Sequence, residues 1–142
     1  MPLDRDDALH ALLSETQTIA VLGIKAGADD DAHRVPSYLH RRGLRILPVS
    51  PKLDTWQGTP CVATLADLPE TPDLVDVFRA SRHLAGHTDE ILALEVPPRA
   101  VWFQEGIRDA ESTARLEAAG IEVVEDRCLM VDYARLFPES RS

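Results

Sequence analysis

The sequence has few of the residues that mark several common protein classes. Its only two cysteines, Cys61 and Cys128, lie in no CxxC or Cys/His spacing. We therefore expect two reduced thiols rather than a disulfide framework or a metal site. No apolar run is long enough for a membrane span, and no basic segment precedes an apolar one as in a signal peptide. These absences predict a cytoplasmic protein with no membrane partner.

Positive charge is scarce as well. The 15 Lys and Arg residues face 24 Asp and Glu residues, which gives a formal net charge of -9. Proteins that bind nucleic acid usually present a basic face, so no nucleic-acid partner is expected. Any anionic ligand must be held by a local group of cations.

The length of the chain predicts one domain spanning residues 1–142. Residues 1–17 form an N-terminal helical addition in this interpretation, because the acidic Asp4, Asp6 and Asp7 precede leucines at helical spacing. Residues 138–142 are expected to be a frayed tail. No repeat or linker interrupts the chain.

Short apolar runs alternate with helical patterns along the chain, which is typical of a parallel sheet. A helix predicted at 35–42 has Pro36 in its first turn, and another predicted at 109–119 has Asp109 as its N-cap and Gly120 as its stop. Further helices are predicted at about 83–94 and from Leu129 onward. The predicted strands are 18–23, 45–49, 74–78, 100–103 and 121–124.

The expected fold is an α/β, Rossmann-like domain with a five-stranded, mainly parallel sheet in the order 3-2-1-4-5 and helices on both faces. Pro48 weakens the second strand, because proline donates no ladder hydrogen bond and prefers sheet edges. Sheets of this kind bind ligands beyond the carboxyl ends of their strands. Functional residues are therefore sought there.

The loop after the first strand, residues 23–27, is rich in small residues that allow backbone N–H groups to approach a phosphate. It matches neither the GxGxxG fingerprint nor the P-loop, so an ordinary turn explains it equally well. The following acidic run, Asp29 to Asp31, would repel a polyanion. We interpret this run as a solvated helix start with Asp31 as a candidate cap.

Four cations fall near predicted strand ends. Lys25 and Lys52, the only lysines, follow the first and second strands, Arg79 follows the third, and Arg34 lies near the first crossover helix. Such a group suits a ligand like coenzyme A, which carries roughly four negative charges at neutral pH. The alternative is four solvent-exposed charges without a ligand.

The turn at 104–106 follows the fourth strand. In the order 3-2-1-4-5 it faces the loop at Gly23 across the topological switch point, so that the two loops form one cleft. Trp102 either lines this cleft or belongs to the core.

Several of these segments, in this order and spacing, resemble the small bacterial CoA-binding proteins, relatives of the CoA-binding domain of the succinyl-CoA synthetase alpha subunit. The resemblance extends from Thr18 to about Tyr133. It rests on Ile19-Ala20-Val21-Leu22-Gly23, Leu47-Pro48-Val49-Ser50-Pro51-Lys52, Val75-Asp76-Val77-Phe78-Arg79, Ala100-Val101-Trp102-Phe103-Gln104-Glu105-Gly106 and Val123-Val124-Glu125-Asp126-Arg127-Cys128.

The resemblance implies a ligand, coenzyme A or an acyl-CoA, and a role for each segment. Gly23, Ile24 and Lys25, with Arg34 and Val35, would approach the phosphates, and Ser50, Pro51 and Lys52 the phosphorylated ribose. Phe78 and Arg79 would flank the adenine or diphosphate, and Gln104, Glu105 and Gly106 would close the opposite wall. The second domain that carries the synthetase's phosphorylated histidine has no counterpart here, so no ligase reaction is expected.

No catalytic constellation is evident. The histidines at 10, 33, 40, 83 and 87 have no partner in a known motif, and we interpret them as surface residues. Cys128 either reacts with the ligand thiol or is an inert buried thiol. The sequence thus predicts a non-catalytic binding protein acting as a sensor, carrier or accessory subunit, with an unidentified protein partner for the last role. An NADP-binding oxidoreductase or redox sensor is the alternative, because Lys52 suits a phosphorylated ribose.

Overall fold

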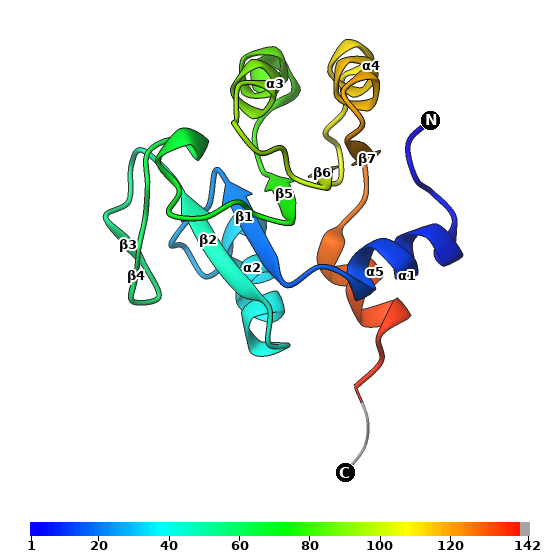
Figure 1. Ribbon diagram of the computed structural model, residues 1–142. Helices are drawn as coiled ribbons and strands as arrows, with labels where there is room; N and C mark the ends of the chain where they lie inside the picture. The colour runs from blue at the N-terminus through cyan, green and yellow to red at the C-terminus, as the bar shows by residue number, and fades with distance from the viewer. Residues whose placement is uncertain (140–142) are drawn as a thin grey trace.

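The computed structural model describes residues 1–139 and shows an α/β fold around one parallel sheet. The predicted frayed tail at 138–142 falls partly outside these residues. The sheet order is β2-β1-β5-β6-β7, and every neighbouring pair is parallel (Figure 1). The α/β class and all five predicted strands are confirmed. The strands are β1 (Thr18–Leu22), β2 (Arg45–Val49), β5 (Leu74–Val77), β6 (Ala100–Phe103) and β7 (Glu122–Val124).

The predicted strand order 3-2-1-4-5 is wrong, because the third strand, β5, pairs with β1 and leaves β2 at the sheet edge. In sequence order the sheet reads 2-1-3-4-5. Pro48 supplies the physical reason, since an interior β2 would leave one ladder hydrogen bond unmade at its missing N–H. On the outer side of β2, Val62 donates to the Pro48 carbonyl at 3.2 Å. The topological switch point therefore lies between β1 and β5.

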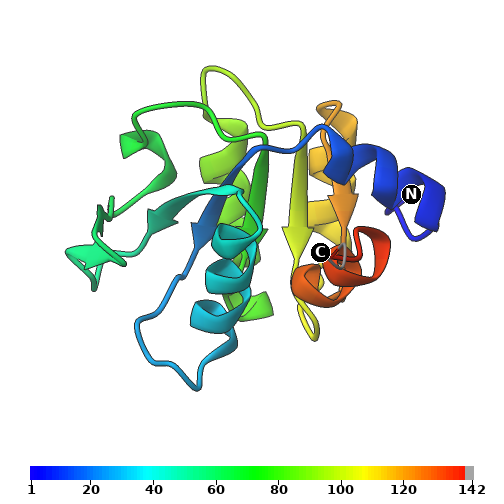
Figure 2. The same ribbon diagram turned by 90° about the horizontal axis from the view of Figure 1, so that it is seen from below.

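Helices cover both faces of the sheet, as predicted. One face carries α1 (Asp6–Ser14), α2 (Asp31–Arg41) and α5 (Leu129–Leu136), and the other carries α3 (Leu84–Leu92) and α4 (Ala110–Ala118). Figure 1 shows these two groups on opposite sides, and Figure 2 views the α2 and α5 side directly. None of the helices within residues 1–139 is both long and apolar enough to cross a membrane.

Helix α2 begins four residues earlier than predicted. Asp30, not Asp31, is its N-cap and accepts a hydrogen bond from the Ala32 N–H at 2.9 Å. Pro36 consequently lies in the helix interior, where it cannot donate to the Ala32 carbonyl four residues back. The Lys25 N–H bonds to that carbonyl instead, at 3.3 Å. The proline thus ties α2 to the loop after β1.

A short hairpin, β3 (Thr55–Trp56) and β4 (Thr59–Pro60), follows β2 and was not predicted. Its turn places Gln57 and Gly58 at positive φ, and the Trp56 indole N–H donates to the Lys25 carbonyl at 3.1 Å. The hairpin therefore supports the same loop that Pro36 ties to α2. The 3-10 helices η1 (Leu65–Asp67) and η2 (Ser81–His83) complete the connections.

The strands are buried on both faces, and their alternation divides the core into two clusters. Trp102 is fully buried, so it is a core residue rather than a cleft residue. Asp76 in β5 is also fully buried, and neither of its carboxylate oxygens has a hydrogen-bond partner within residues 1–139. Burial raises the pKa of Asp76 well above its usual value, because the charged form is disfavoured where no hydrogen bond or cation compensates for the lost water.

Candidate functional site

Two adjoining hollows lie at the carboxyl ends of the strands. The first, about 300 Å³, lies beyond β1 and β2, and the second, about 180 Å³, lies beyond β5 and β6. Lys25 and Arg79 line both hollows. The hollows therefore lie side by side and share two wall residues, and we call the two together the cleft.

A larger hollow, about 740 Å³, lies elsewhere, along the open edge of β2. Its walls are mostly apolar, and its arginine, Arg45, is paired with Glu70 at 2.6 Å. It offers no group of free cations to an anionic ligand. The cleft at the strand ends is therefore the better candidate for a functional site.

The cleft brings together ten of the thirteen candidate residues. Arg34, Val35 and Gly106 line neither hollow. Gly23, Ile24, Lys25, Ser50, Pro51, Lys52 and Arg79 line the first hollow. Lys25, Phe78, Arg79, Gln104 and Glu105 line the second hollow.

Each of the three remaining residues has a different environment. Val35 is 1% exposed and packs in the core under α2. Arg34 lies on the outer side of α2, where it pairs with Asp31. Gly106 donates its N–H to Asp126 at 2.7 Å, which shapes the turn after β6. Their direct contact with a ligand stays a prediction.

The acidic run before α2 pairs with two of the four candidate cations. Lys25 Nζ lies 3.5 Å from Asp30, and Arg34 pairs with Asp31. Lys52 and Arg79, in contrast, have no carboxylate within salt-bridge distance in the described part of the chain. These two side chains are the strongest uncompensated positive charges at the cleft.

Position 23 requires glycine because of its backbone conformation and because the segment after β5 approaches it closely. Its φ is +85°, a conformation that L residues rarely adopt. A Cβ atom there would lie 2.7 Å from the Phe78 carbonyl oxygen and 2.9 Å from Arg79 Cδ. The glycine thus lets the Arg79 side chain lie across the end of β1.

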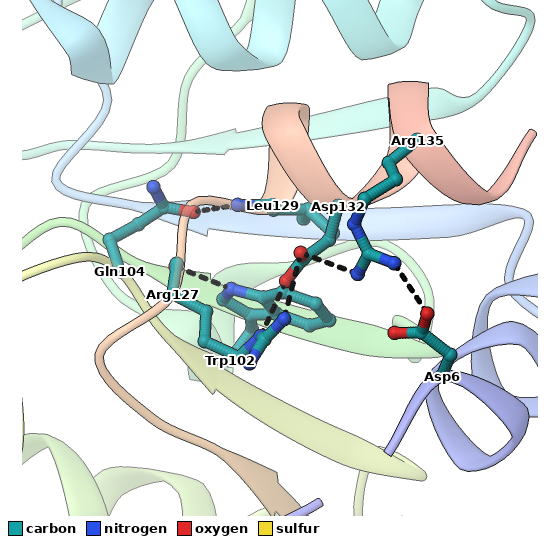
Figure 3. Close-up of polar contacts among 7 residues, drawn as sticks. All are labelled: Asp6, Trp102, Gln104, Arg127, Leu129, Asp132 and Arg135. Atoms are coloured by element: carbon teal, nitrogen blue, oxygen red, sulfur yellow. Dashed lines mark hydrogen bonds and ion pairs between the residues drawn. The ribbon is translucent and has the colours of Figure 1, made fainter. Parts of the chain in front are cut away.

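Gln104 and Cys128, in the segment after β7, line the second hollow on the side away from β1. The Gln104 side-chain oxygen accepts the Leu129 N–H at 3.2 Å, which fixes the start of α5 (Figure 3). The Trp102 indole N–H donates to the Arg127 carbonyl at 2.8 Å, which anchors the same segment to β6. Cys128 lines the second hollow, as its position after the last strand led us to expect.

Sequence reasoning missed two cleft residues on α3, His87 and Glu90, both of which line the first hollow. The sequence pattern alone favours a surface position for His87. It accepts a hydrogen bond from Arg79 Nε at 3.3 Å and contacts Glu90 Oε1 at 3.2 Å. Their spacing of three residues on one helix was a signal, but only the pairing of β5 with β1 brings that helix to the cleft.

His33 also differs from the expected surface histidine. Its Nδ1 lies 3.0 Å from the Lys25 carbonyl and 3.2 Å from the Trp56 indole nitrogen. The ring therefore helps to support the loop after β1. Within residues 1–139, no group of three His, Cys, Asp or Glu side chains is arranged to hold a metal ion.

The fold and the cleft together define a class: a Rossmann-like α/β domain with a cleft at the carboxyl ends of its strands. A family profile described as a CoA binding domain matches residues 17–134. The chain belongs to this CoA-binding domain family, which confirms the resemblance inferred from the motifs.

The relatives agree with this membership. The chain is 32% identical over 126 residues to the uncharacterized protein YneT of Bacillus subtilis (strain 168), covering 89% of this chain and 92% of that protein. It is 47% identical to a solved Thermus thermophilus protein, cell-free ID.343, with a TM-score of 0.89 over 94% of this chain and 100% of that one.

A larger protein contains the same fold as one part. The dinucleotide-forming acetyl-coenzyme A synthetase 1 of Ca. Korarchaeum cryptofilum matches 78% of this chain with 26% of its own, at 18% identity and a TM-score of 0.66. At this identity the match shows a shared fold.

Proposed function

We propose that this protein binds coenzyme A, or an acyl-CoA, in the cleft and does not itself transform it. The observation that carries the proposal is the cleft's pair of uncompensated cations, Lys52 and Arg79, in a member of the CoA-binding domain family. Coenzyme A has a diphosphate and a separate ribose phosphate, so it presents anionic groups at more than one point. Cations spread along a cleft suit such a ligand.

The charge balance of the protein supports the same proposal. With a net charge of -9, the protein as a whole repels a polyanion, so its affinity must come from short-range contacts. Lys25 can add to them, because its pair with Asp30 is long and solvent-exposed, and such pairs contribute at most about 1 kcal/mol. A ligand phosphate can therefore replace Asp30 as its partner.

The contacts of His87 agree with binding without catalysis. His87 is engaged with Arg79 and Glu90 rather than paired with a serine or cysteine nucleophile. A role as sensor, carrier or accessory subunit follows from binding alone. For the last of these, the partner protein would supply any chemistry.

Isothermal titration of the protein with CoA, dephospho-CoA and NADP tests the proposal. We expect CoA to bind most tightly, because both its diphosphate and its ribose phosphate find cations. If millimolar CoA gave neither a measurable heat of binding nor competition with the other ligands, the proposed function would be wrong. Tighter binding of NADP than of CoA would favour the oxidoreductase or redox sensor instead.

Charge reversal tests the location of the site. Lys52→Glu and Arg79→Glu should each weaken CoA binding by about tenfold or more, with a loss that shrinks as salt rises. If Lys52 contacts the phosphorylated ribose, Lys52→Glu should cost much less affinity for dephospho-CoA. The control is Arg5→Glu, the same change of charge at an exposed residue outside the cleft. Equal effects of all three variants would show that only net charge matters and would move the site elsewhere.

A further inference from the structure

Arg79, like Lys25, lies between the two hollows, and its stem has a fixed path. It lines both hollows, and its Cγ and Cδ lie only 3.3 Å and 2.9 Å from where a Cβ on Gly23 would be. The stem therefore rests against the glycine backbone at the end of β1. The direction of the guanidinium group then depends on what its nitrogen atoms contact.

That contact is His87, which acts through a defined tautomer. Arg79 Nε donates to His87 Nε2 at 3.3 Å, and a ring nitrogen can accept a hydrogen bond only when it carries no proton. The remaining ring proton is then on Nδ1, which donates to Glu90 Oε1 at 3.2 Å. Glu90 is itself fixed, because its Oε2 accepts the Leu65 N–H at 3.0 Å. A backbone group in η1 thus sets the orientation of a side chain in the cleft.

We propose that His87, oriented by Glu90, is a positioning residue that directs the Arg79 guanidinium toward an anionic ligand without neutralising its charge. A carboxylate partner would hold Arg79 equally well, but it would also cancel the positive charge, as Asp31 does for Arg34. A neutral imidazole accepts from Nε and leaves the two terminal nitrogens free for phosphate oxygens. The inference rests on the proposed binding of CoA.

The test compares two substitutions of His87 in the full-length protein. His87→Ala should weaken CoA binding about fivefold, because one hydrogen bond to a charged group is lost. His87→Gln should stay within about twofold of the parent, since the glutamine oxygen can accept the Arg79 Nε–H in place of the ring nitrogen. A residue that merely filled space would not be rescued by this polar replacement.

Arg79→Ala supplies the second arm. In that background His87→Ala should have no further effect on CoA affinity, because there is no guanidinium left to position. A fivefold loss that persists in the Arg79→Ala background would overturn the inference. So would parental affinity in His87→Ala.

A measurement without ligand keeps the inference testable even if a folded variant binds CoA poorly. The Nε–H proton of Arg79, observed by ¹⁵N NMR, should exchange with water more slowly in the parent than in His87→Ala. Equal exchange would contradict the hydrogen bond itself. Failure of the parent protein to bind CoA would instead refute the proposed function, and so the two failures are distinguishable.

Discussion

Two groups of basic side chains in this protein have opposite surroundings. Arg127, in the segment after β7, and Arg135, on α5, both donate to Asp132 at 2.7 to 3.0 Å, and Arg135 also reaches Asp6 at 2.7 Å (Figure 3). We call these four residues the arginine cluster. Lys52 and Arg79 in the cleft have no such carboxylate within residues 1–139. The charges of the arginine cluster compensate one another. The positive charges of Lys52 and Arg79, in contrast, remain available to an anionic ligand.

The burial of Asp132 determines what this difference between the two groups means for stability. The Asp132 side chain is 6% exposed, so burial acts to raise its pKa, but hydrogen bonds from Arg127 and Arg135 outweigh burial and the net pKa is lowered. The ionised carboxylate is thus the stable form only with its arginines in place. The comparison predicts that the arginine cluster serves stability and the cleft serves binding.

The largest effect should come from removing the shared carboxylate. Asp132→Ala leaves Arg127 without a carboxylate partner and Arg135 with Asp6 alone, and breaking such a partly buried pair should cost about 2 kcal/mol of unfolding free energy. Urea denaturation measures this loss. CoA affinity of the folded variant should change less than about twofold, because its cleft cations are untouched.

Asp89→Ala is the matched control, because Asp89 pairs with Arg115 at 2.5 Å but is 68% exposed. Its cost should be below about 1 kcal/mol. If Asp89→Ala destabilised the protein as much as Asp132→Ala, burial of the arginine cluster would not be the source of its stability.

The next effect concerns the cleft. Gly23→Ala should lower CoA affinity by about tenfold, because the strained φ costs about 1 kcal/mol and the new methyl group displaces the Arg79 stem. Titration with CoA measures the loss. Gly27→Ala, in the same loop but with nothing within 4 Å of its Cβ position, should bind normally. Equal affinities of the two variants would show that the position of Arg79 does not matter.

Much of the fold was predictable because local patterns determine it. The five strands follow from short apolar runs, and α4 has the predicted Asp109 cap and ends before Gly120, whose φ is +82°. The strand order was not predictable from such local patterns, although Pro48 indicated an edge position for β2. The start of α2 was misplaced because Pro36 was assumed to lie in a first turn, whereas the Lys25 N–H replaces its missing hydrogen bond.

The candidate site was predictable to the extent that it depends on strand ends. Lys25, Lys52 and Arg79 follow three strands and meet in one cleft. The roles of Arg34 and His87 depend instead on which way a helix side chain turns and on which strands are neighbours. Neither follows from the local sequence, which does not show that Arg34 pairs with Asp31 or that His87 reaches the cleft. Direct contact of Arg34 with a ligand stays a prediction.

Asp76 offers the most specific test, because it is a buried carboxyl with no cation partner within residues 1–139, the reverse of the cleft. Its raised pKa means that the folded state holds a proton that the unfolded state releases above its usual pKa of about 3.9. This residue's contribution to stability is therefore fully present below that pH and is lost as pH rises toward the raised pKa. Asp76→Asn cannot ionise, so its stability relative to the parent should increase with pH.

Urea denaturation of Asp76→Asn and of the parent at pH 5 and pH 8 measures the difference. The variant should gain stability relative to the parent over that range, because only the parent loses the contribution of the buried proton as pH rises toward the raised pKa of Asp76. Any cost of the unpaired amide is the same at both pH values and cancels. Asp89→Asn, at an exposed carboxylate, should show no such change. A pH-independent difference for Asp76→Asn would mean that its carboxyl is ionised in the fold, and that a partner for it exists which the arginine cluster and the cleft do not supply.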